Sequence, residues 1–263
     1  MSPRVRTALW AAPVLLGVLV LGGAVLLGVL LAAVAAVGVH EYRRLVVPDG
    51  SPLEDAFAVG WGAVLVLAFL SPHRELPVVL LCLGTLGYFG LWMAGPGPRE
   101  DLAARWGATV GGWVLVALFL GHALWIRAHG VLPVMYLLAV VWAGDIAAYY
   151  VGSALGSTPL APRVSPKKSV EGAAASLAAA VLTGGVLSLV FPLPHGAWGG
   201  AAGAAVLNVA AQGGDLVESL LKRWAGVKDS GTLFPGHGGV LDRVDGFLLA
   251  APLYAGYLAV LGG

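Results

Sequence analysis

Long apolar stretches separated by short breaks dominate this chain of 263 residues. A helix needs roughly 20 mostly apolar residues to cross about 30 Å of hydrocarbon, and the runs between charged or Pro/Gly-rich breaks have about that length. The pattern therefore predicts about nine membrane-spanning helices, near residues 8–22, 24–42, 54–70, 76–94, 106–125, 131–151, 172–191, 197–214 and 246–262.

The first two predicted helices are separated only by Gly22 and Gly23. These glycines indicate either a hairpin turn or a flexible point in one long helix of about 45 Å. The apolar stretch at residues 8–39 is much longer than the core of an export signal, which has about 7–15 residues, and the rest of the chain is also apolar. We therefore interpret it as membrane-embedded.

The positive charges favour the count of nine. With the N-terminus in the cytoplasm, 13 of the 15 Lys and Arg residues fall on the cytoplasmic side, and only Arg74 and Arg127 fall on the other. The positive-inside rule asks for such a bias. Merging the first two helices would place the N-terminal arginines opposite Arg43 and Arg44, which is a worse distribution. We expect a multi-pass membrane protein, and the many Ala, Gly, Val and Leu residues with few Lys suggest a bacterial source and so an inner (plasma) membrane.

Composition agrees with this class and excludes others. Hydrophobic residues make up 59% of the chain and charged residues 11%, where a soluble domain carries about a quarter. The net charge of +1 provides no strongly basic surface for nucleic acid. A lone cysteine, Cys82, excludes a disulfide framework and a cysteine metal cluster. The expected fold is an all-α polytopic membrane protein.

Two polar segments, Gly152–Glu171 and Asp215–Asp245, lie on the same predicted side of the membrane. Long polar connections between membrane helices tend to carry function. We expect these two cytoplasmic loops to form an active site. Glycine pairs spaced by four residues, such as Gly152 with Gly156, are better explained by close helix packing than by catalysis.

The segment Asp215–Asp245 holds five of the 14 acidic residues. If residues 215–224 are helical, intervals of three and four place one set of polar side chains on a single face: Asp215, Glu218, Ser219 and Lys222. Such an amphipathic helix could lie at the membrane boundary. An alternative is a solvated helix with ion pairs and no further role.

The residues that follow favour chemistry over that alternative. Glycines around His237 let backbone amides approach phosphate oxygens closely, and the nearby Lys and Arg supply positive charge. Carboxylates hold Mg²⁺ together with substrate phosphates and water. The set suits a reaction in which a nucleoside triphosphate loses pyrophosphate, with one or two metal ions. The absence of a GxxxxGK[ST] sequence excludes a P-loop NTPase.

The other polar segment adds two candidate features. Asp145 lies inside an apolar helix, where an ionisable residue is a functional hypothesis by default, although a neighbour on another helix could simply satisfy it. Ser165 and Ser169 with Arg163, Lys167 and Lys168 are typical of a phosphate clamp at a helix start, which Ser169 would cap. The alternative for the basic residues is cytoplasmic anchoring.

Both segments closely resemble the phosphatidate cytidylyltransferase (CDP-diglyceride synthase) family. The C-terminal signature of that family is matched without a gap by Ser219, Leu221, Lys222, Arg223, Lys228, Asp229, Gly231, Pro235, His237, Gly238, Gly239, Asp242, Arg243 and Asp245. Its upstream pattern is matched by Asp145, Ala148, Tyr149, Gly152, Gly156, Ser165, Pro166, Lys167, Lys168, Glu171 and Gly172. The resemblance covers roughly residues 140–262, with small departures at Ser169 and Phe234, and extends upstream only to the span pattern and to Glu41-Tyr42.

The resemblance implies a reaction of CTP with phosphatidate in the bilayer that gives CDP-diacylglycerol and pyrophosphate and depends on Mg²⁺. The expected partners are these two substrates and no nucleic acid, with a homodimer left open. The resemblance also implies one integral membrane domain, with N-terminal helices at residues 1–130 and a catalytic region at residues 131–263.

The same resemblance implies residue roles. We expect Asp215 and Asp229 to hold the metals, assisted by Asp242 or Asp245. Lys222, Arg223, Lys228 and Arg243 would bind the lipid phosphate and the triphosphate, and His237 would contact the leaving diphosphate. The expected substrate-binding residues are Asp145, Ser165, Lys167, Lys168, Ser219, Gly238 and Gly239.

Three rival functions remain open on the sequence. A secondary transporter would also have many spans and an intramembrane Asp145, but it would concentrate polarity at the bilayer midplane and show inverted repeats. A CDP-alcohol phosphotransferase would carry an Asp-Gly-x-x-Ala-Arg signature, which this chain lacks. A scaffold without activity is disfavoured by the intact motifs.

Replacing Asp229 tests the predicted metal set. Asp229→Ala should abolish turnover and leave the protein folded and inserted in the membrane, because the lost carboxylate would serve the metal and not the fold. Turnover of purified protein in detergent measures this. A rate close to that of the unaltered protein would remove Asp229 from the metal site.

Overall fold

The computed structural model describes residues 14, 16–95, 101–233 and 238–262. The chain divides into two compact units. The first unit contains Met1–Trp125 and Val227–Arg243, and the second contains Ile126–Gly226 and Val244–Gly263. The division at residue 130 that the sequence suggests stays a prediction.

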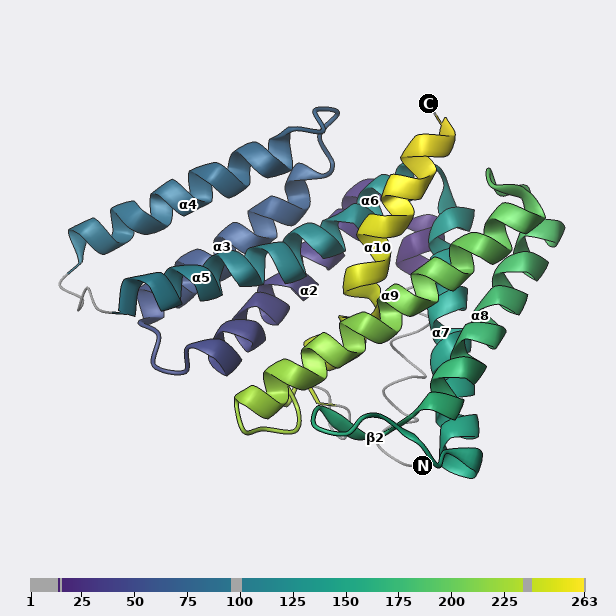
Figure 1. Cartoon of the computed structure of the whole chain (residues 1–263). Helices are drawn as coiled ribbons and strands as arrows, with labels where there is room; N and C mark the ends of the chain where they lie inside the picture. The colour runs from purple at the N-terminus through teal and green to yellow at the C-terminus, as the bar shows by residue number, and fades with distance from the viewer. Residues whose placement is uncertain (1–13, 15, 96–100, 234–237, 263) are drawn as a thin grey trace. The chain divides into compact units, whose positions relative to one another are not determined.

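The first unit is built from helices that pack side by side (Figure 1). They are α2 (Gly23–Val46), α3 (Pro52–Ala68), α4 (Leu76–Ala94), α5 (Leu102–Gly112), the π-helical η2 (Trp113–Leu118) and most of α6 (Phe119–Ala128). The last three follow one another without a break over residues 102–128. Their buried core includes Trp113, whose indole N–H donates to the Ala58 carbonyl at 2.8 Å.

The second unit contains three long helices and a small sheet. The helices are α7 (Val131–Leu155), α8 (Val170–Val190) and α9 (Gly196–Trp224), and α10 (Leu241–Gly262) joins them from Val244 onward. The two strands, β1 (Pro159–Ala161) and β2 (Ser165–Ser169), pair antiparallel between α7 and α8. In Figure 1, α8 runs alongside both α7 and α9.

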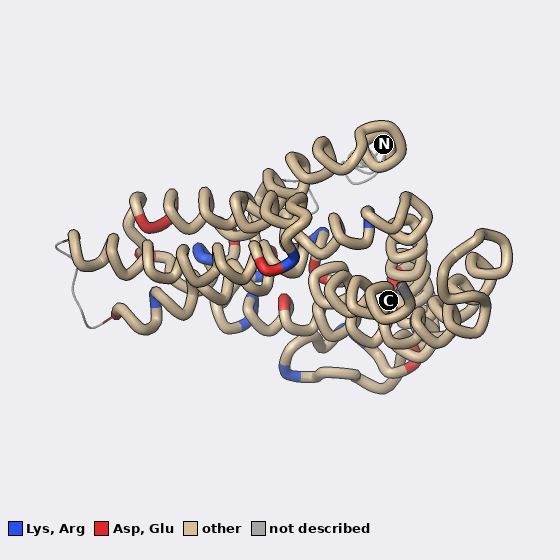
Figure 2. Tube along the Cα trace, turned by 90° about the horizontal axis from the view of Figure 1, so that it is seen from above, with Lys and Arg blue, Asp and Glu red and all other residues tan. Residues whose placement is uncertain are grey.

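Among the described residues, six helices are long and apolar enough to cross a membrane: 23–46, 76–94, 102–128, 131–155, 170–190 and 241–261. Figure 2 shows Lys, Arg, Asp and Glu as short patches between long stretches of uncharged tube. The fold is thus a nearly all-α, multi-pass architecture. Helix α3 has only 17 residues, and the uncharged first part of α9 is rich in glycine and not apolar enough, so neither is among the six.

The helical run before α2 ends at Gly22–Gly23. Residues 16–21 are helical, Gly22 is a bend, and Gly23 has a φ of +67°, which L side chains rarely adopt. The break that the sequence indicates is therefore confirmed, and the choice between a hairpin and a flexible point stays a prediction.

The predicted polar segment Asp215–Asp245 is largely helical at both ends, which corrects its assignment as a loop. Helix α9 continues from Gly196 to Trp224, and α10 begins at Leu241. Charged residues end an apolar run but do not end a helix, and residues 215–224 contain no Gly or Pro. The helix stops instead at Gly226, with φ +70°, whose N–H donates to the Arg223 carbonyl at 3.1 Å.

The predicted segment Gly152–Glu171 also needs correction. Helix α7 extends to Leu155, and β1 and β2 form a hairpin where we expected an irregular loop. A tight turn accounts for the hairpin, because Pro162 has a fixed φ and the Val164 N–H closes the turn onto the Ala161 carbonyl at 3.1 Å. Such a short, polar hairpin lacks the apolar alternation that reveals strands in a sequence.

Glycines bring the helices of each unit close together. A Cβ on Gly172 of α8 would lie 3.0 Å from the Ala148 carbonyl oxygen and 3.2 Å from Gly152 Cα of α7. A Cβ on Gly84 of α4 would lie 2.1 Å from the indole nitrogen of Trp61, which donates to the Leu80 carbonyl. Close backbone approach drives helix association in a bilayer, as the glycine spacing predicts.

The contact between Gly84 and Trp61 can be tested by substitution. Gly84→Ala should destabilise the protein by about 1–3 kcal/mol, because the rigid, hydrogen-bonded indole cannot move aside. Gly90→Ala is the matched control on the same helix, since nothing lies within 4 Å of its added Cβ. Thermal unfolding in detergent should show a lower Tm for the first variant only. Equal Tm values for the two variants would contradict this packing.

Candidate active site

Three carboxylates gather in the second unit. Asp215 and Glu218 lie one turn apart on α9, and Asp245 comes from α10. One oxygen from each of them lies within 4.8 Å of the other two. The approach of the two helices depends on Gly214, where a Cβ would lie 2.3 Å from the Asp245 carbonyl oxygen.

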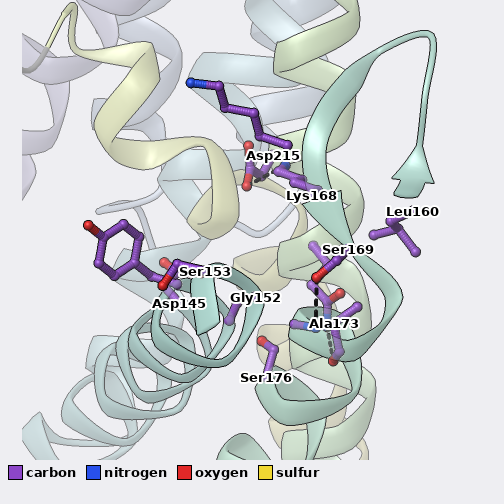
Figure 3. A pocket seen from close by; sticks show the side chains of 14 residues that line it. Asp145, Gly152, Ser153, Leu160, Lys168, Ser169, Ala173, Ser176 and Asp215 are labelled. Atoms are coloured by element: carbon purple, nitrogen blue, oxygen red, sulfur yellow. Dashed lines mark hydrogen bonds and ion pairs between the residues drawn. The ribbon is translucent and has the colours of Figure 1, made fainter. Parts of the chain in front are cut away.

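Two lysines balance this negative charge. Lys168 Nζ of β2 lies 2.5 Å from Asp215 Oδ2, and Lys222 Nζ lies 2.5 Å from Glu218 Oε2 one turn further along α9. Figure 3 shows Lys168 and Asp215 pointing toward each other. The predicted helix face with Asp215, Glu218 and Lys222 is therefore confirmed.

The carboxylates fit a divalent cation. Mg²⁺ prefers oxygen ligands and is usually held by one or two carboxylates together with substrate phosphates. Asp215, Glu218 and Asp245 supply such a donor set from two adjacent helices. The identity of the metal stays a prediction.

A cavity of about 520 Å³ lies next to the cluster, and Asp215 belongs to both. This volume is in the range of sites for small molecules, about 300–1,000 Å³. Figure 3 shows its lining, with Asp145 and Ser153 on one side and Lys168, Ser169 and Asp215 on the others. The predicted substrate residues Asp145, Lys167 and Lys168 all line it. Ser165 lies in β2, and Ser219 follows Glu218 on α9.

The hairpin is fixed at both of its ends. Ser169 Oγ accepts from the Gly172 N–H at 3.1 Å and caps α8, as the sequence predicts. The Glu171 carboxylate accepts from Ser157 Oγ at 2.7 Å and from the Thr158 N–H. The Arg223 Nε of α9 donates to the Val164 carbonyl at 3.3 Å. These bonds hold the β2 lysines over the cavity.

A chain of polar side chains lies along one wall of the cavity. Asn208 is 1% exposed and donates to Ser176 Oγ at 2.9 Å. Gln212 in turn donates to Asn208 Oδ1 at 2.6 Å and to the Ala173 carbonyl at 3.3 Å. Because Ser176 and Gln212 line the cavity, this chain places neutral polar groups beside the charged ones.

Other predicted site residues belong to the first unit. Asp242 Oδ2 accepts from the Ser230 N–H and from the Gly239 N–H, both at 2.8 Å, and from Ser230 Oγ at 2.9 Å. Lys228 and Asp229 are exposed. Gly238 has a φ of +82°, which requires glycine. Arg243 follows Asp242 on α10, and His237 lies outside the described residues. The metal roles of Asp229 and Asp242 stay predictions.

Glu218 is the residue that the sequence-based metal set omitted. Its signal was present, because Glu218 follows Asp215 by three residues and so shares its helix face.

Comparison with known sequences identifies the family of this chain. The cytidylyltransferase family matches residues 2–261 of the chain. The chain belongs to this cytidylyltransferase family. A phosphatidate cytidylyltransferase of Pseudomonas aeruginosa is 34% identical over 269 residues, covering 100% of this chain and 98% of that protein.

Other family members are more similar over a shorter stretch. A phosphatidate cytidylyltransferase of Brucella melitensis is 53% identical over 124 residues, and one of Bacillus subtilis is 42% identical over 132 residues. The match to the Brucella protein covers 47% of this chain and 46% of that protein, and the match to the Bacillus protein covers 50% and 49%. This chain therefore aligns with about half the length of each relative.

Because Lys168 pairs with Asp215, we predict that Lys168 and a metal ion compete for the Asp215 carboxylate. Lys168→Met should tighten binding of Mn²⁺ about fivefold, since a partly exposed ion pair contributes up to about 1 kcal/mol. Mn²⁺ binding to the detergent-purified protein can be followed by electron paramagnetic resonance. Lys167→Met removes the same charge from the adjacent residue and is the control. Equal affinities in the two variants would show that Lys168 does not compete.

Proposed function

We propose that the protein transfers a cytidylyl group from CTP to phosphatidate and forms CDP-diacylglycerol and pyrophosphate. The observation that carries this proposal is the carboxylate cluster beside a lysine-lined cavity, in a chain whose full length matches a protein named phosphatidate cytidylyltransferase. Phosphate-rich substrates need positive charge and a metal-binding carboxylate set, and the second unit provides both.

In the proposed reaction an oxygen of the lipid phosphate attacks the α-phosphorus of CTP. The new bond joins that oxygen to the α-phosphorus, and the bond from the α-phosphorus to the β-phosphate oxygen breaks. The electron pair leaves with pyrophosphate. Lys167 and Lys168 bind phosphate oxygens at the cavity, and their fixed hairpin keeps the groups aligned, because such transfers depend mainly on positioning and charge neutralisation.

We also propose Mg²⁺ as the cofactor, held by Asp215, Glu218 and Asp245. When bound, the ion would neutralise charge that develops on the leaving diphosphate. The carboxylates set its position, and Lys222 limits the net charge of the cluster through its ion pair with Glu218.

The finer topology is part of the proposal. Six described helices can span the membrane, and we add residues 8–22, α3 and the uncharged first part of α9 to reach nine. At 1.5 Å per residue, α3 is about 26 Å long, close to the thickness of the hydrocarbon. The positive-inside distribution supports an inner-membrane protein with its active site toward the cytoplasm.

Release of pyrophosphate tests the proposed reaction. Purified protein in detergent, given phosphatidate and Mg²⁺, should release pyrophosphate with CTP and not with ATP, and EDTA should stop it. Release that does not need phosphatidate would contradict the proposed acceptor. Folded protein that releases none with any nucleotide would favour a transporter or a scaffold.

Asp245 should be needed for that activity. Asp245→Asn should lower kcat about 100-fold or more, the scale of losing one electrostatic contact to a transition state. It should also weaken binding of Mn²⁺, measured independently of turnover. Glu75→Gln changes an exposed carboxylate just before α4 and is the control. Unaltered Mn²⁺ affinity in Asp245→Asn would remove Asp245 from the metal-binding set.

A further inference from the structure

A buried carboxylate of α2 anchors the glycine-rich segment of the first unit. Glu41 is 6% exposed. Its Oε1 accepts from the Val240 N–H at 2.9 Å, and its Oε2 accepts from the Leu241 N–H at 2.9 Å and from Ser230 Oγ at 3.0 Å. One side chain thus holds both ends of the segment Ser230–Leu241, about 190 residues away in sequence.

The backbone around Glu41 is shaped to receive it. A Cβ on Gly239 would lie 2.4 Å from both carboxylate oxygens, and a Cβ on Gly231 would lie 2.4 Å from Oε1. Only glycine allows the chain to approach so closely. The Val240 and Leu241 amides are at the start of α10, where N–H groups lack intrahelical acceptors and favour a negative charge.

Asp242 completes the same arrangement from the other side. Ser230 Oγ lies 3.0 Å from the Glu41 carboxylate and 2.9 Å from that of Asp242, and Asp242 also accepts from the Gly239 N–H. The two ends of the segment are therefore held by two carboxylates that share one serine. Asp242 directly follows the segment, whereas Glu41 comes from α2.

We propose that Glu41 is a positioning residue for the reaction, acting through the segment Ser230–Leu241, which lies between Lys228 and Asp229 on one side and Arg243 on the other in the sequence. This inference rests on the proposed function. Glu41 contacts no substrate in the proposed reaction. Its carboxylate determines where the segment lies. Displacing a catalytic group by about 1 Å can cost about 100-fold in rate, so loss of the anchor should be visible in kcat.

An isosteric substitution removes the anchor most selectively. In Glu41→Gln, the amide NH₂ must face either the Val240 N–H or the Leu241 N–H, so each orientation sets a donor against a donor. Glu41→Asp keeps a charged acceptor and should restore part of the function. Ser230→Ala removes only the shared hydroxyl and leaves both amide bonds of Glu41 in place, so it serves if Glu41→Gln fails to fold.

The control must be a largely buried carboxylate that does not touch the segment. Glu54 of α3 is 13% exposed in its side chain, lies 3.6 Å from Arg43 Nη2 and 3.7 Å from Arg105 Nη1, and belongs to the same unit. Glu54→Gln should lower Tm through a weakened ion pair, yet leave the segment unchanged.

Two readouts separate positioning from stability. Hydrogen–deuterium exchange of peptides spanning residues 229–241 should quicken in Glu41→Gln and stay unchanged in Glu54→Gln. Pyrophosphate release, measured well below the Tm of every variant, should show kcat lowered at least about tenfold in Glu41→Gln, partly restored in Glu41→Asp and little changed in Glu54→Gln. Ser230→Ala should give intermediate exchange and an intermediate rate.

Unchanged exchange in Glu41→Gln would overturn the inference. So would faster exchange with a normal kcat, since Glu41 would then serve stability alone. If the unaltered protein releases no pyrophosphate, the proposed function fails, and the exchange measurement still decides whether Glu41 anchors the segment.

Discussion

Charge inside an apolar protein must be matched by a partner, and this requirement organises both units. Arg43 is 1% exposed and is paired with Asp55 at 3.1 Å. Glu41 is matched by amides and a hydroxyl, and Lys168 by Asp215. Leaving the buried Arg43 or Glu41 unpaired would cost several kcal/mol, whereas the partly exposed pair of Lys168 and Asp215 contributes less. Each pairing therefore fixes a segment in place as well as stabilising it.

The helices could be predicted well from the sequence, because apolar length and flanking charge report membrane spans directly. The predicted helix ends were wrong where we took charged residues to end a helix. Helix α9 continues ten residues past the predicted end at Gly214, and α10 starts five residues before the predicted start at Gly246. The sequence did not predict the hairpin between α7 and α8, because its short polar strands lack the alternation of apolar and polar residues that indicates a strand.

The sequence indicated many residues of the candidate site, but not which of them contact one another in the fold. Spacing along one helix revealed the face of Asp215 and Lys222, and the cap at Ser169 followed from residue type alone. Contacts between distant segments have no such local signal. The pairing of Lys168 with Asp215, and the bonds from Glu41 to the start of α10, depend on tertiary structure that spacing does not encode.

The glycine contacts limit how the protein could be made more robust for work in detergent. Water-soluble proteins gain stability when cavities are filled with larger apolar groups. Lipid tails are as apolar as leucine, so a larger side chain at Gly172 or Gly214 would gain little from burial and would separate helices that now touch by backbone. Thermostabilising substitutions are better sought at glycines with open surroundings, such as Gly60 and Gly107, where alanine favours the helix and meets no neighbour.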